Sequence, residues 1–141
     1  MPVNMKNTIA EAFIKLSDEK AIDKITVKDV VEECNISRQS FYYHFQDILE
    51  VVEWSTEQSF EKLLNRSLQE DDPEIVLNEF ITASEAAALF MQKLLRSQKR
   101  EQVEWMMVRN IRSYLQDMIS AKGKMPKIPF EDLEVALDFW T

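Results

Sequence analysis

The chain has 141 residues, of which 45% are hydrophobic and 30% are charged, and its formal net charge at pH 7 is −8. A single Gly and four Pro leave little material for tight hairpins, which favours an all-α globular fold. One Gly also excludes the glycine-rich loops that bind nucleotide phosphates, and one His and one Cys exclude the usual zinc sites. We therefore expect neither an enzyme nor a bound metal or cofactor.

The sequence shows no signal peptide, no membrane-spanning segment and no pair of cysteines for a disulfide. Its first residues lack a basic start followed by an apolar run, and no stretch approaches the roughly 20 apolar residues that span a bilayer. Cys34 has no partner for an internal disulfide and falls on the apolar side of a predicted helix. We expect a reduced core cysteine in a cytoplasmic protein with no membrane partner.

The first predicted helix covers residues 5 to about 19. Its apolar residues recur at spacings of three and four, as in a helix that buries one face. The residues expected to face inward are Ile9, Ala12 or Phe13, and Leu16, followed in the next loop by Ile22 and Ile25.

The stretch from Thr26 to Phe45 predicts two short helices joined by a tight turn. Thr26 is expected to cap the first helix, and Asp29, three residues on, to complete a pair that resembles a capping box. Asn35 tolerates the left-handed conformation that ends a helix better than other non-glycine residues do. Ser37 is then expected to cap the second helix.

Both short helices bury one face and leave the other free. The predicted inward residues are Val27, Val30, Val31 and Cys34 in the first helix, Ile36 in the turn, and Phe41 and Phe45 in the second helix. The other residues of the second helix are polar or aromatic with few charges, which suits a surface that recognises another molecule. The arrangement is a helix-turn-helix.

These residues resemble a known family. The runs NTIAEAFIKL and KITVKDVVEECNISRQSFYYHF are similar to the N-terminal DNA-binding domain of the TetR/AcrR transcriptional regulators, over roughly residues 6–52. The most specific part is the string from Ile36 to Phe45. The family usually has Gly where this chain has Asn35, and often Lys where it has Ile48. The resemblance implies a three-helix head on double-stranded DNA, joined to a helical domain for dimerisation and a small-molecule inducer.

The resemblance and side-chain chemistry together imply roles for residues of the helix-turn-helix. Arg38 can offer two donors to a guanine edge and Gln39 can pair with adenine, at the helix end that enters the major groove. Ser40 and Tyr43 join them as secondary base contacts, with a phosphate role left open. Phosphate contacts, which fix register without reading sequence, are assigned to Thr26, Lys28, Ser37, Tyr42 and His44.

The negative charge of the chain argues against DNA binding, because nucleic-acid binders carry a basic surface. However, residues 34–46 contain no acid, and Arg38 is their one full positive charge. An alternative from another class stays open: a helical protein-interaction module or co-regulator that keeps the fold and has lost direct DNA binding.

The second half of the chain predicts further long helices. Asp47 is expected to cap a helix that continues to about Leu68, and the acidic stretch 69–73 forms a linker with Pro73 in the next first turn. Helices are then expected over about 73–97 and 101–121, and a last one from Phe130. We expect a DNA-binding domain at 1–46 and a ligand-binding and dimerisation domain at 47–141, incomplete at its C-terminus.

Bulky side chains of this second domain are the candidate effector pocket, although periodicity alone assigns them to a core. They are Trp54, Phe80, Phe90, Trp105, Met106 and Met118. Flexible Met suits a pocket and an irregular core equally. A basic cluster, Lys93, Arg96, Lys99 and Arg100, is interpreted as a solvated helix end favoured by the helix dipole.

Taken together, these features predict a cytoplasmic, homodimeric transcriptional regulator of TetR type. It would bind a pseudo-palindromic operator and act as a repressor released by a small-molecule effector.

Overall fold

The computed structural model describes residues 4–122, and every regular element in that range is helical. The α-helices are α1 (Met5–Ser17), α2 (Val27–Cys34), α3 (Arg38–His44), α4 (Ile48–Gln69), α5 (Pro73–Leu95) and α6 (Arg100–Lys122), with a short 3-10 turn η1 (Ile22–Lys24) after α1. The predicted all-α fold is therefore confirmed. The stretch from residue 123 on, which includes the helix expected from Phe130, lies outside the described residues.

The ends of α2 follow from its own sequence. The Thr26 hydroxyl accepts a hydrogen bond from the Asp29 amide at 3.1 Å, and the Asp29 carboxylate accepts one from the Thr26 amide at 3.0 Å. This reciprocal pair is the predicted capping box. Asn35, at the other end, has a φ of 56°, the predicted left-handed cap. Both ends of α2 are therefore held by local contacts, and the turn into α3 has one geometry.

The other predicted caps are also present. The Ser37 hydroxyl accepts a hydrogen bond from the Ser40 amide at 3.0 Å at the start of α3. Asp47 caps α4 and Asp72 caps α5, and Pro73 is the first residue of α5. Pro fits that position because its missing amide hydrogen would have no partner within the helix anyway.

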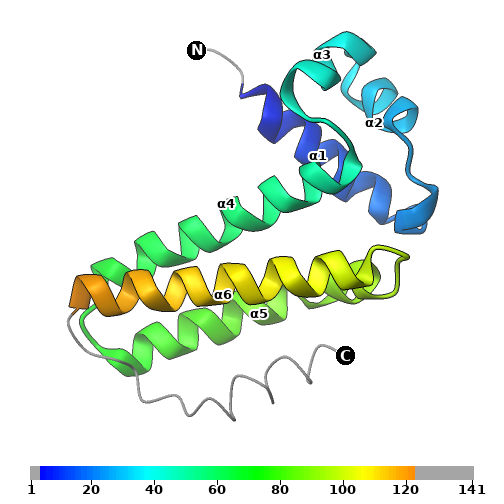
Figure 1. Cartoon of the computed structure of the whole chain (residues 1–141). Coiled ribbons are helices and arrows are strands. Elements are labelled where there is room, and N and C mark those ends of the chain that lie inside the picture. Colours follow the sequence, from blue (N-terminus) through cyan, green and yellow to red (C-terminus); the bar gives the residue numbers. More distant parts are fainter. Residues whose placement is uncertain (1–3, 123–141) are drawn as a thin grey trace.

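The helices form two groups: Figure 1 shows α1–α3 at the start of α4, and α5 and α6 alongside α4. We call α1–α3 the head and α4–α6 the body. The body helices lie lengthwise beside one another, with α5 and α6 antiparallel, and the turn between them points back toward the head. The head is thus connected to the body along the chain through the start of α4.

One cluster of buried side chains continues from the head into the body. Phe13 and Phe41 are fully buried in the head, and Val51, Leu94 and Val103 belong to the same cluster in the body. The Phe13 and Phe90 rings meet edge to face, with centroids 6.2 Å apart. The predicted inward residues Ile9, Leu16, Ile22, Ile25 and Phe45 are also buried here.

A second, smaller cluster lies farther along the body, around Leu63, Tyr114 and Met118. It contains a buried hydrogen bond of 2.7 Å between the hydroxyls of Ser67 and Tyr114. Burial, the largest effect there, raises the pKa of Tyr114, so its hydroxyl stays neutral. This polar pair joins α4 to α6 at the end of the body away from the head.

The surface of the body keeps several large apolar side chains. Leu77, Ile81 and Leu89 of α5 and Trp105 of α6 are exposed. Periodicity assigned Trp105 to a core, and that assignment is wrong, because its ring on α6 is 70% exposed. Within residues 4–122, no helix combines the length and apolar character needed to cross a bilayer.

Candidate DNA-binding surface

The second helix of the helix-turn-helix, α3, is held by the side chains of one face. Phe41 is fully buried and Phe45, just after the helix, is 2% exposed. Their ring centroids lie 6.0 Å apart, and Phe45 also packs edge to face on Trp54 of α4. A helix of seven residues is not stable by itself in water. The packing of Phe41 and Phe45 therefore holds α3 in place, with its opposite face exposed to solvent.

The four residues predicted to contact bases lie on or beside that outward face. Arg38 and Gln39 are exposed at the start of α3, Ser40 is half-buried, and the Tyr43 ring is 84% exposed. The Tyr43 ring packs on none of the buried core residues, so the fold itself gives no reason for an aromatic side chain at this exposed position. Its position one turn after Gln39 on the same short helix is consistent with the predicted contact surface.

The five residues predicted to contact phosphates surround this face. Thr26, Lys28, Ser37 and Tyr42 are exposed, and His44 is half-buried with its ring edge to face against Tyr43. Thr26 and Ser37 accept hydrogen bonds from backbone amides as helix caps. Each hydroxyl keeps its own hydrogen to donate to an anion such as a phosphate oxygen.

The charges of the head are arranged so that Arg38 keeps its positive charge uncompensated. Within residues 4–122, no carboxylate forms an ion pair with Arg38, whereas Lys28 lies 4.0 Å from Glu32 and Lys20 lies 3.2 Å from Asp29. The α2 carboxylates Asp29, Glu32 and Glu33 are thus paired with lysines rather than with Arg38. This local arrangement makes an acidic chain compatible with the predicted DNA contact of α3.

Sequence reasoning missed Lys6, whose ammonium lies 5.4 Å from the centroid of the Phe45 ring. This cation–π contact joins the first turn of α1 to the end of α3. It adds a positive charge to the head from a residue 39 positions away in the chain. No local sequence pattern marks such a contact, because it depends on how α1 packs on α3.

The environment of Cys34 does not favour a reactive thiol. The Cys34 thiol is half-buried and donates a hydrogen bond to the Thr8 carbonyl at 3.7 Å. Burial raises the pKa of this thiol, so it stays protonated at neutral pH. Cys34 therefore packs on the core as predicted, and within residues 4–122 no group of three metal-ligating side chains is present.

We expect Thr26→Ala to weaken both the fold and DNA binding. Loss of the cap should lower the free energy of unfolding by about 1 kcal/mol. Affinity should fall to a similar degree for specific and random duplexes, because a phosphate contact carries no sequence information. Urea unfolding and titration with both duplexes would measure these effects. A loss confined to the specific duplex would contradict the phosphate role.

The same cap gives a pH dependence with a defined sign. The hydrogen bond from the Thr26 amide, and then the one from Lys20, lower the pKa of Asp29 below its usual 3.8. The cap therefore stabilises the head at neutral pH, and this stabilisation is lost as the pH falls through the lowered pKa.

The six residues of the candidate effector pocket do not meet at one site. Trp54, Phe90 and Met106 belong to the cluster shared by head and body, whereas Phe80 and Met118 belong to the smaller cluster, and Trp105 is exposed. Two of them, Trp105 and Met106, line a common cleft.

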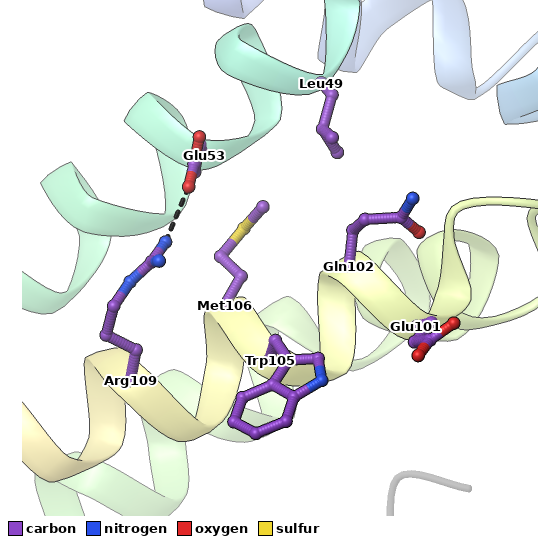
Figure 2. A pocket seen from close by; sticks show the side chains of 7 residues that line it. All are labelled: Leu49, Glu53, Glu101, Gln102, Trp105, Met106 and Arg109. Carbon is purple, nitrogen blue, oxygen red and sulfur yellow. Dashed lines mark hydrogen bonds and ion pairs between the residues drawn. The ribbon is translucent and has the colours of Figure 1, made fainter.

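That cleft lies between the start of α4 and the first turns of α6, and its volume is about 460 Å³. Figure 2 shows Met106 and Trp105 together with the ion pair of Glu53 and Arg109, which joins the two helices. The other lining residues are Leu49, Glu101 and Gln102. The cleft combines an indole face, an apolar floor and charges of both signs, next to the helix that leads into the head.

Comparison with known proteins identifies the head. Residues 9–53 match the family model described as bacterial regulatory proteins, tetR family. The chain is 36% identical over 69 residues to the transcriptional activator DhaS of the dhaKLM operon of Lactococcus lactis, covering 45% of this chain and 37% of DhaS. It is 36% identical over 61 residues to IcaR of Staphylococcus aureus, a negative regulator of the biofilm operon icaADBC, covering 43% of this chain and 33% of IcaR.

The family match lies in the part that carries the helix-turn-helix. The chain spans about a third of the length of these curated relatives. No solved structure matches the chain significantly. The capped helix-turn-helix, its outward α3 surface and the family match over residues 9–53 together show that the head of this chain is a helix-turn-helix domain of the tetR type.

Proposed function

We propose that this protein is a sequence-specific transcriptional regulator that binds double-stranded DNA through α3. The observation that carries the proposal is the surface of α3. Arg38, Gln39 and Tyr43 project from a helix fixed by Phe41, in a head that matches the tetR family. Arg38 and Gln39 supply base contacts, with Ser40 and Tyr43 beside them. Thr26, Lys28, Ser37, Tyr42 and His44 hold the flanking phosphates.

The functional form is proposed to be a homodimer. One α3 carries a single full positive charge, so one head offers few phosphate contacts and modest affinity. Two heads related by a two-fold axis would bind half-sites about 34 Å apart, or a multiple of that distance, on a pseudo-palindromic operator. Residues 47–141 would supply the dimer contact, and the exposed Leu77, Ile81 and Leu89 of α5 are apolar surface available for it.

Selection of duplexes from a random pool by the full chain tests this proposal. We expect enrichment of an inverted repeat whose half-sites are one helical turn apart or a multiple of it. A chain with Arg38 and Gln39 both replaced by Ala is the matched control and should enrich no repeat. The proposal is wrong if the unaltered chain, folded and pure, also enriches none.

The rival function, a protein-interaction module, differs in its response to salt. Phosphate contacts release counterions, so the logarithm of affinity for the enriched duplex should fall linearly with the logarithm of salt concentration. Binding that is insensitive to salt would favour the protein-interaction module.

The sign of regulation and its control belong to the body. One relative is an activator and another is a negative regulator, although both are 36% identical to this chain over the part that they match. We propose repression that is released by a small-molecule effector bound to the body. The cleft with Trp105 and Met106 supports this, because a ligand there would touch both α6 and the start of α4. The effector acts only if it binds the DNA-competent and released arrangements with different affinity.

A further inference from the structure

The end of α5 and the turn from α5 to α6 touch the head through polar atoms of residues far apart in the chain. The Lys93 ammonium donates a hydrogen bond to the Ser17 carbonyl at 2.8 Å and lies 3.5 Å from the Asp18 carboxylate. The Gln98 amide donates to both carboxylate oxygens of Asp23, at 3.0 and 3.1 Å. We call this set the head–turn contact.

The head–turn contact satisfies backbone groups on both of its sides, and on the head side it completes the C-terminal end of α1. Ser17 is the last residue of α1, where carbonyl groups lack partners within the helix, and the body supplies Lys93 to it. Gln98 lies in the turn two residues before α6, and the head supplies the Asp23 carboxylate to its backbone amide. A cation at a helix C-terminus and an anion near a helix N-terminus both match the helix dipole.

The parts of this contact differ in strength. The Lys93 side chain is 30% exposed, so its hydrogen bond to Ser17 is partly shielded from water. Its ion pair with Asp18, which is 71% exposed, contributes little because solvent screens it. The prediction that the basic cluster is only a solvated helix end is therefore wrong for Lys93, because its ammonium caps α1 from another helix.

The neighbouring apolar contact cannot fix the angle of the head alone. Phe13 and Phe90, together with Leu94, bury apolar surface beside Lys93, and the hydrophobic effect is non-directional. Hydrogen bonds weaken steeply when their donors and acceptors rotate out of line. The hydrogen bonds of the head–turn contact thus select one orientation of the head among those that the apolar surfaces allow.

We infer that the head–turn contact is a second connection between body and head, in addition to the start of α4, and that Lys93 and Asp23 are positioning residues for α3. A shift of the α5–α6 turn is transmitted to the head through these two side chains. In the proposed dimer, this shift changes the angle between the two α3 helices; this consequence rests on the proposed function. It does not alter the α3 surface itself.

Distances between spin labels on the head and the body test the contact without DNA. Nitroxides would be attached at Glu32→Cys in α2 and Gln116→Cys in α6, both exposed positions, in a Cys34→Ser background. Lys93→Met keeps the apolar stem and removes the ammonium, and Asp23→Ala removes the carboxylate. We expect both changes to broaden or shift the distance distribution, and Lys93→Arg to preserve it.

Two matched controls remove a charge from the same region without touching the contact. Arg96→Met and Glu19→Ala should leave the distribution of the parent protein unchanged. Circular dichroism establishes that each variant is folded, and the changes at Lys93 and Asp23 are independent, so each tests the contact by itself. Unchanged distributions in both Lys93→Met and Asp23→Ala would overturn the inference, whatever the protein binds.

Binding to two unlabelled duplexes tests the consequence for DNA. Affinity for the full inverted repeat should fall roughly fivefold or more in Lys93→Met and Asp23→Ala, within the range of typical coupling between sites. Affinity for a duplex with one half-site should stay unchanged, because each head is intact and only simultaneous engagement is lost. Equal losses on both duplexes would show damage to the head and overturn the positioning role. If the parent protein binds neither duplex, the proposed function fails and the label distances alone decide on the contact.

Discussion

Arg38→Ala is expected to reduce affinity for the operator by about 1–3 kcal/mol and to relax the preference at one base pair. Arg38 is exposed at the start of α3, and within residues 4–122 no carboxylate is paired with it. Its guanidinium is therefore free to offer two parallel donors to a guanine edge. Titration of the operator, of operators altered at single base pairs and of random duplexes would measure the effect.

Arg38→Lys separates the charge of this side chain from its shape. Lysine keeps the positive charge but lacks the planar pair of donors. We expect Arg38→Lys to retain binding to random DNA and to lose much of the discrimination between base pairs. If Arg38→Ala weakens operator and random duplex equally, Arg38 contacts a phosphate and the base assignment is wrong.

Phe41→Ala is expected to lower the free energy of unfolding by about 3–5 kcal/mol, the range for removing a buried aromatic ring. Phe41 is fully buried, and its ring packs against both Tyr42 and Phe45. Because a domain is stable by only about 5–15 kcal/mol, this change should leave the head largely unable to hold α3. Urea unfolding followed by circular dichroism would measure the loss.

Tyr43→Ala is the matched control, since it removes a ring from the same helix at an exposed position. Its effect on unfolding should stay within about 0.5 kcal/mol. It should nevertheless weaken DNA binding, so the pair separates structural from functional aromatic residues on α3. A loss of less than about 1 kcal/mol in Phe41→Ala would mean that the site collapses to fill the cavity.

The helix boundaries were predictable because the signals that set them are local. Thr26 with Asp29, Asn35, Ser37, and Asp47 each act on atoms within a few residues along the chain. The burial of Phe41 and Phe45 followed from their spacing in a short helix with one apolar face. The DNA-facing residues remain predictions, because what they touch lies outside this chain.

What could not be predicted depends on how helices pack. Apolar periodicity does not show which side of α6 meets α4 and α5, so the exposed Trp105 was assigned to the interior. Lys93 looked like an ordinary basic residue at a helix end, and its acceptor on Ser17 lies 76 residues away. The candidate pocket residues were grouped by size, whereas the fold divides them between two clusters.

The buried cluster that crosses from α1 into α5 restricts how this protein can be engineered or can exchange parts during evolution. A head grafted onto this body must present a side chain that fits Phe90, whose ring meets that of Phe13 at 82°. Recombination after residue 46 would cut the chain between α3 and α4, but it would also separate side chains that pack in one buried cluster. Such a cluster tolerates little change of shape. A stable chimera would therefore need the last turns of α5 and helix α1 to come from the same parent protein.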